Sequence, residues 1–111
     1  MSEPVLRFES VPDRVRVRFR DEVIVDTRRA KLLHELGHAP VYYFPEVDVR
    51  REQLQPSDHH THCPRKGDAS YWSLEGAPNA IWYYPYPIES ASFIAGHVAF
   101  YPQHVEIEVG G

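Results

Sequence analysis

The sequence predicts an all-β domain of about seven or eight short strands separated by turns. Residues 14–20 alternate strictly between arginine and an apolar residue, which is the period of a half-buried strand. Residues 41–44 and 80–84 are rich in aromatic and β-branched side chains, which favour strands. Ten prolines are spread through 111 residues, and no long apolar stretch has a helical period. We therefore expect one domain over residues 1–111, with at most one or two short helical turns.

The first third of the chain is predicted to contain a lead-in segment and a hairpin. Residues 1–12 form the lead-in, which Pro4 and Pro12 interrupt. In residues 14–20 the apolar side chains face the core and the arginines face away, and after a tight turn residues 23–27 return as a strand. Residues 28–36 are compatible with a short helix or with an extended segment, and Gly37 ends either one. Glu35 follows a leucine pair, so a buried carboxylate there would need a partner.

The rest of the chain predicts short strands around one central hairpin. Pro64 forces Cys63 into an extended conformation. Residues 64–67 then form a turn, in which Gly67 can supply a positive φ. Asp48 can hydrogen-bond its own backbone in an earlier turn. The expected elements follow in chain order: a strand at 41–44, a turn at 45–48, a charged connection at 50–56, the hairpin at 57–73, a loop at 75–79, a strand at 80–84, one helical turn at 88–94, and strands at 97–101 and 105–109.

Cys63 and Lys66 lie across the predicted turn from each other, so both are candidate catalytic residues. The ammonium group of Lys66 would stabilise a Cys63 thiolate and make it a nucleophile. The alternative is that Cys63 is a small residue buried at the end of a strand. Strand alternation places His62 on the opposite face from Cys63, which weakens a dyad between these two residues.

His60 and His62 are weak candidates for a metal site. They lie two residues apart on one strand face, with Asp58 as a third group on that face. No fourth ligand is evident, and surface or hydrogen-bonded histidines explain the pattern equally well. No metal and no cofactor are therefore predicted.

Six of the fourteen aromatic residues lie between residues 71 and 86. Alternation puts Trp82, Tyr84 and Tyr86 on one face. Such rings fill a hydrophobic core or, since they carry polar tips, line a ligand pocket.

Net charge is −4, distributed as +2 over residues 1–31 and −6 over residues 32–111. The acidic bulk argues against nucleic-acid binding, which needs a basic surface. No run of apolar residues is long enough to span a membrane, and the N-terminus lacks the pattern of a secretory signal. A single cysteine fits a reducing cytoplasm, so we expect a cytoplasmic protein that does not bind membranes.

The central motif resembles that of the DUF427 family, a bacterial family of uncharacterised function. The resemblance is carried by residues 56–59 and 61–73, with Thr61-His62-Cys63-Pro64-Arg65-Lys66-Gly67-Asp68 at their centre, and by residues 41–45, 48–49, 80–85 and 94–101; His60 departs from the family pattern. It implies a β-tent, Mss4-like fold, in which two antiparallel sheets splay and leave a pocket between them. Relatives of that fold often bind zinc through two Cys-x-x-Cys pairs, which a chain with one cysteine cannot provide.

Three functions remain open. The first is a small-molecule-binding β-domain with its pocket between the two sheets, beside residues 63–67. In this hypothesis Lys66 pairs with an anionic group of the ligand. The second is an enzyme in which Cys63 is the nucleophile, Lys66 stabilises its thiolate, and a histidine or Asp58 moves the proton. The third is an interaction module that uses the arginine face of residues 14–20 or an exposed aromatic patch. The sequence specifies neither the ligand, nor a reaction, nor the oligomeric state. The residues expected to line the pocket or bind the ligand are Tyr43, Asp48, Thr61, Lys66, Tyr71, Trp82 and Tyr84.

Overall fold

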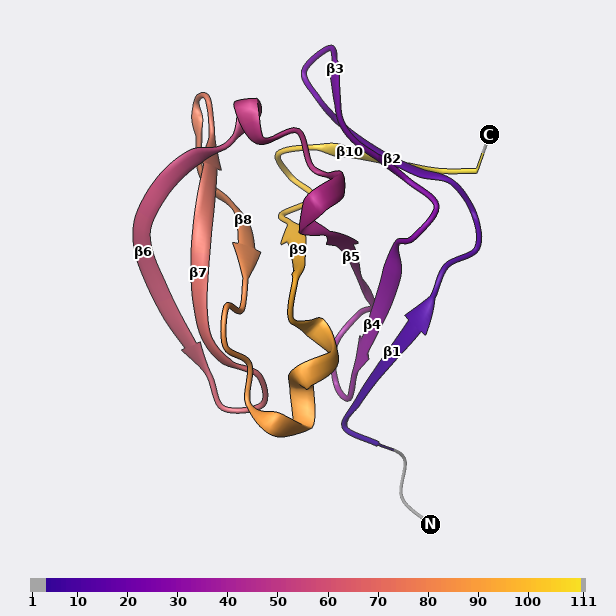
Figure 1. Cartoon of the computed structure of the whole chain (residues 1–111), viewed down its shortest axis with the longest axis vertical. Coiled ribbons are helices and arrows are strands. Elements are labelled where there is room, and N and C mark those ends of the chain that lie inside the picture. Colours follow the sequence, from indigo (N-terminus) through magenta and orange to yellow (C-terminus); the bar gives the residue numbers. More distant parts are fainter. Residues whose placement is uncertain (1–3, 111) are drawn as a thin grey trace.

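The computed structural model describes residues 4–110 and shows two antiparallel sheets (Figure 1). The larger has seven strands in the order β1-β4-β5-β9-β8-β7-β6, and the smaller has three in the order β10-β2-β3. The strands are β1 (Leu6–Ser10), β2 (Val15–Phe19), β3 (Glu22–Thr27), β4 (Lys31–Glu35), β5 (Val41–Pro45), β6 (Gln55–Cys63), β7 (Gly67–Leu74), β8 (Ala77–Tyr83), β9 (His97–Phe100) and β10 (Glu106–Val109). The helical elements in the described part of the chain are short 3-10 helices: η1 (Glu46–Asp48), η2 (Arg51–Gln53) and η3 (Glu89–Ile94). The all-β prediction is confirmed.

The small sheet follows the predicted alternation. On its central strand β2, Val15 and Val17 are fully buried and Phe19 is almost so, as expected for one apolar face of a strand. The opposite face carries the arginines, and two of these pair with acids on the neighbouring strands. Arg14 binds Asp26 of β3 at 2.6 and 2.8 Å, and Arg18 binds Glu108 of β10 at 2.5 Å. This face is therefore charged, but much of its charge is compensated.

The seven-stranded sheet has a different environment on each face. One face packs against the small sheet through a core that includes Phe44 of β5, Ile81 of β8, and Val98 and Phe100 of β9. A second cluster, which includes Tyr43, lies on the other face, and η3 contributes to it. Because alternate residues of β5 face opposite ways, Tyr42 and Phe44 belong to the first cluster and Tyr43 to the second.

Strand β5 joins two parts of the large sheet that diverge. Its first residues, Val41 to Tyr43, pair with β4, whereas only its last two, Phe44 and Pro45, pair with β9. From Tyr43 toward Val41, β5 no longer pairs with β9, so the β1-β4-β5 part and the β9-β8-β7-β6 part separate there. This separation leaves an angle on the face that carries Tyr43, and the candidate site lies there.

Strand pairing determines the structure of two N-terminal segments, residues 1–12 and 28–36, within the described part of the chain. The predicted lead-in, residues 1–12, contains the strand β1, which pairs along its whole length with β4. Its Phe8 ring packs 5.8 Å from Tyr43 and 5.2 Å from Phe93, and this contact explains why the segment is ordered between its prolines. Residues 28–36, for which helix and strand were both open, contain the strand β4. Gly37 follows it with φ of +86°, a conformation that favours glycine.

Three boundaries differ from the prediction. The expected loop at 75–79 is a tight turn at Glu75 and Gly76, and β8 already begins at Ala77. The expected connection at 50–56 holds η2 and the start of β6. Alternation does not extend to Tyr86, which is 91% exposed, because β8 ends at Tyr83 and the strand period ends with it.

Within residues 4–110, no helix has the length and apolar character needed to cross a lipid bilayer.

Candidate functional site

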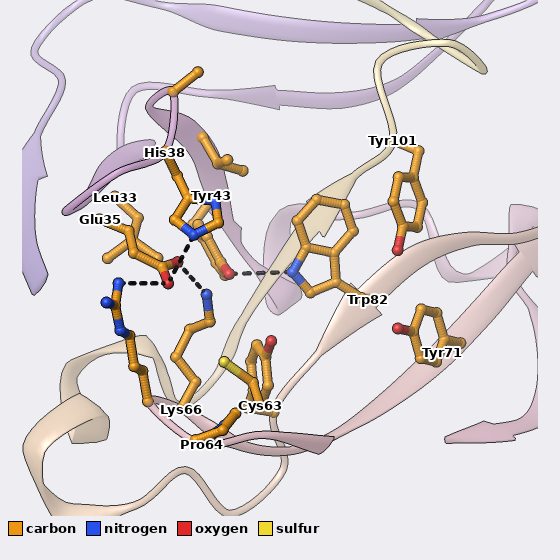
Figure 2. A pocket seen from close by; sticks show the side chains of 14 residues that line it. Leu33, Glu35, His38, Tyr43, Cys63, Pro64, Lys66, Tyr71, Trp82 and Tyr101 are labelled. Carbon is orange, nitrogen blue, oxygen red and sulfur yellow. Dashed lines mark hydrogen bonds and ion pairs between the residues drawn. The ribbon is translucent and has the colours of Figure 1, made fainter. Parts of the chain in front are cut away.

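A cavity of about 550 Å³ lies in the angle of the large sheet (Figure 2). Its walls come from β4, β5, β7, β8, the β6–β7 turn, and the segments that follow β4, β8 and β9. The expectation of a pocket between the two sheets was wrong, because the inner face of the small sheet is fully used in the first core. The lining residues are Leu33, Glu35, His38, Ala39, Val41, Tyr43, Cys63, Pro64, Arg65, Lys66, Tyr71, Trp82, Tyr84 and Tyr101.

The β6–β7 turn brings Cys63 and Lys66 to the cavity. The backbone N–H of Lys66 donates to the carbonyl of Cys63 at 3.1 Å, and the Lys66 carbonyl accepts from Ile88 at 2.9 Å. Gly67 has φ of +120°, and a Cβ there would lie 3.4 Å from the Tyr86 carbonyl oxygen. The turn therefore needs glycine, and the 86–88 segment fixes its position.

Lys66 forms a buried ion pair with Glu35 at one end of the cavity. Its Nζ lies 2.5 Å from Glu35 Oε1, and the two side chains are 11% and 12% exposed. Arg65 also approaches this carboxylate, at 3.3 Å, and His38 does so at 3.6 Å, the latter labelled in Figure 2. Burial opposes ionisation of Glu35, but the hydrogen bond and the charge of Lys66 outweigh it and lower the pKa of the carboxyl group.

The other end of the cavity is an aromatic wall around Trp82. Trp82 Nε1 donates a 3.1 Å hydrogen bond to the hydroxyl of Tyr43, and the two rings meet edge to face. Trp82 pairs with Ala99 of β9, whose small side chain leaves room for the rings to meet above it. Tyr101 packs 4.5 Å from Trp82 on the other side. Burial raises the pKa of Tyr43 to about 12, and burial together with the neighbouring Tyr71 hydroxyl raises the pKa of Tyr101.

Tyr84 places a buried hydroxyl group beside the ion pair. The residue is only 7% exposed, and Lys66 Nζ lies 5.9 Å from the centre of its ring. Its hydroxyl oxygen has no hydrogen-bond partner among residues 4–110. In the described part of the chain, the side-chain nitrogen and oxygen atoms that lack a hydrogen bond and are also shut off from solvent are Arg16 Nε and Trp72 Nε1. The Tyr84 hydroxyl is not among them. The oxygen of Tyr84 therefore keeps contact with the open space, and burial raises the pKa of its hydroxyl.

The structure brings most of the residues singled out from the sequence to this cavity. Thr61 does not line it, but its hydroxyl bonds to that of Tyr71 at 2.7 Å and orients that ring from outside. Asp48 lies away from the cavity. The singled-out residues that do line the cavity are Tyr43, Cys63, Lys66, Tyr71, Trp82 and Tyr84.

Asp48 is a structural residue in this fold, so its expected role at the pocket was wrong. It accepts hydrogen bonds of 2.7 Å from Thr27 and from Arg29, which fix η1 to the end of β3. Burial raises the pKa of Asp48, but these two hydrogen bonds outweigh it and lower the pKa. Both oxygens of its carboxylate therefore already accept hydrogen bonds within the fold.

Several residues of the site were not predicted to line the pocket. For Glu35 the sequence indicated only a carboxylate that needs a partner, and that partner is Lys66, 31 residues later. His38, Arg65 and Tyr101 carried no signal of their own, since only the fold brings them to one cavity.

His60 and His62 of β6 lie on the strand face opposite Cys63 and do not line the cavity. His62 pairs with Asp68 at 2.8 Å, and His60 lies 3.3 Å from the Ser70 hydroxyl. Across residues 4–110, no three side chains of His, Cys, Asp or Glu are arranged to bind a metal ion.

Fold and cavity together define a small β-domain with a charged aromatic pocket. The chain belongs to the family described as a domain of unknown function, DUF427, whose model matches residues 7–111. The comparison with curated proteins gives no match.

Proposed function

We propose that this protein is a small-molecule-binding β-domain that holds an organic ligand in the cavity beside the β6–β7 turn. The observation that carries the proposal is the buried Lys66–Glu35 pair facing a cavity whose opposite wall is aromatic. A few polar groups in an otherwise apolar concave site are typical of ligand pockets, and the volume falls in their usual range.

The free-energy cost of burying the Lys66–Glu35 pair favours a role in function over a role in stability. Removing two charges from water costs several kcal/mol for each ion, and an apolar pair of similar size is often at least as stable. Lys66 and Glu35 are nearly buried, and they border open space rather than packed side chains. Buried titratable groups in a cleft of this kind are candidates for a functional site.

The direct test is a thermal-shift screen of the protein against metabolite classes. A ligand at one hundred times its dissociation constant should add about 2.7 kcal/mol to the free energy of unfolding. For a domain of this size this corresponds to a rise of about 10 °C in Tm.

A matched pair of variants connects a positive result to the cavity. Val41→Phe places a ring in the cavity from β5 and should abolish the shift. Val47→Phe makes the same change at a residue that is 82% exposed and should keep it. A ligand that stabilises both variants equally binds elsewhere, and a screen without any hit contradicts the proposal.

A second candidate is an enzyme in which Cys63 is the nucleophile. The observation that favours it is that Cys63 and Lys66 line one cavity, where the ammonium would stabilise the thiol as thiolate. A free thiol in a pocket also agrees with a reducing cytoplasm, which we propose as the location. The rate of Cys63 alkylation against pH tests this function, since a midpoint near 8.5 is that of an ordinary thiol and contradicts it.

A further inference from the structure

We infer that the ligand is a planar aromatic monocarboxylate, with its carboxylate bound by Lys66 and Tyr84 and its ring against Trp82. This inference rests on the proposed function and adds the chemical class of the ligand. Three independent features of the cavity lead to it: its free hydrogen-bond donors, its charge and the position of its rings.

The polar groups that remain available in the cavity are donors. The ammonium group of Lys66 has three N–H bonds, and Glu35 is the acceptor that the described residues supply. Tyr84 is more than nine-tenths buried, and its hydroxyl has no partner within residues 4–110. The hydroxyl of Tyr43 accepts from Trp82, so its own proton stays free to donate. The ammonium can only donate, and each of these two hydroxyls still has a proton to donate, so a ligand with acceptor oxygens satisfies all three groups at once.

The carboxylate of Glu35 does not compete for this role. Lys66, Arg65 and His38 already surround its two oxygens. Two cations and His38 therefore occupy most of the space around this carboxylate, and a ligand that approaches from the cavity meets mainly N–H and O–H groups.

The charge of this end of the cavity fits one negative charge. Lys66 and Arg65 bring two positive charges and Glu35 one negative charge, so one positive charge remains while His38 is neutral. A carboxylate balances that charge. A phosphate dianion would leave one negative charge without a partner in a partly desolvated site, which is costly.

The aromatic wall supplies a surface for a flat ring. Trp82 and Tyr101 are both half-buried, and they lie at the far side of the cavity from the ion pair in Figure 2. Offset-stacked or edge-to-face rings gain about 0.5–1.5 kcal/mol beyond the area that they bury. A ligand with one or two fused rings and a carboxylate at one end matches this separation of apolar and donor groups.

The test compares three series of ligands on the full chain: benzoate, indole-3-carboxylate and 2-naphthoate, the matching primary amides, and the matching aryl phosphates. Calorimetry measures affinity. Protection of Cys63, the single cysteine, from iodoacetamide reports whether the cavity is occupied. We expect at least one carboxylate to bind at least tenfold more tightly than its amide and its phosphate, and to slow alkylation.

Two variants test the residues. Tyr84→Phe removes only the buried hydroxyl and should weaken the carboxylate at least tenfold while changing the amide much less, because hydrogen bonds to ions are the stronger ones. Tyr83→Phe makes the same change on the other face of β8, away from the cavity, and should change neither.

The outcomes separate the inference from the proposed function. An amide or a phosphate that binds as well as the carboxylate, or a Tyr84→Phe variant that binds normally, overturns the aromatic carboxylate and leaves a pocket of another specificity. If none of the three series binds while the thermal-shift screen finds another ligand of the cavity, the inference alone is overturned. If that screen is also empty, both are overturned.

Discussion

Replacing Lys66 by methionine tests how far the ion pair is removed from water. The change removes the ammonium group and keeps a chain of similar length, so Glu35 is left as a nearly buried carboxylate. Breaking a buried pair by removing one partner costs about 3–5 kcal/mol. Arg65 and His38 still approach the carboxylate, so we expect a loss at or just below the lower limit of that range, about 2–3 kcal/mol of unfolding free energy at pH 7.

The effect of pH has a definite sign. In the folded protein the pKa of Glu35 is lowered. The pair therefore stabilises the fold above the ordinary glutamate pKa of about 4.3, and this contribution is lost as pH falls through the lowered folded-state pKa. In Lys66→Met the buried carboxyl group can take up a proton instead. The difference between the variant and the parent should be largest near neutral pH and should shrink below about pH 4.

Urea unfolding at several pH values measures this difference, with two further variants as references. Arg7→Met breaks an exposed pair with Glu9 and should cost less than about 1 kcal/mol. Glu35→Gln combined with Lys66→Met leaves no unpaired buried charge, since Arg65 is 42% exposed, and should recover at least half of the loss. The reasoning is refuted if Lys66→Met is no more destabilised than Arg7→Met at pH 7, because the pair would then behave as a solvated one.

Three other substitutions have expected outcomes. Gly67→Ala puts a side chain at φ of +120° and should lower the unfolding free energy in urea by about 1–3 kcal/mol, so an unchanged midpoint would show that the turn relaxes. Tyr43→Phe removes the acceptor of the Trp82 indole N–H and should cost about 1 kcal/mol; it should also remove the phenol that titrates near pH 12 in ultraviolet absorbance, and a spectrum that keeps this transition would contradict its origin. Asp48→Asn weakens the bond to Arg29 and should destabilise at pH 7 by about 1 kcal/mol, a difference that disappears as pH falls below about 4; a loss that is constant with pH would mean that charge is not involved.

The sequence predicted the fold where a local pattern decides the structure. The alternation of residues 14–20 placed Val15 and Val17 in the core, and the Pro64–Gly67 turn positioned the central hairpin correctly. The strand β1 was missed because its ordering comes from β4 and from the Phe8–Tyr43 contact, neither of which has a local signature. The same is true of residues 28–36, whose extended form depends on pairing with strands on both sides.

The candidate site was predictable in part for a related reason. Lys66 and the rings of β7 and β8 are close in sequence, so turn and strand geometry brought them together in the prediction. Glu35 lies 31 residues from Lys66 in the chain, and only the pairing of β4 with β5 carries it to the cavity. Asp48 was misplaced because a turn aspartate has the same local pattern whether it faces a pocket or, as here, fixes a neighbouring strand.

Side-chain nuclear magnetic resonance of the two tryptophans tests the central claim most directly. Trp82 borders the cavity, whereas the indole N–H of Trp72 is sealed on the opposite face of the sheet and serves as an internal reference. We predict that a hit from the ligand screen moves the Trp82 indole resonance in a saturable way and leaves that of Trp72 in place. Ligands that bind the protein while the Trp82 resonance stays fixed would contradict a binding site in this cavity.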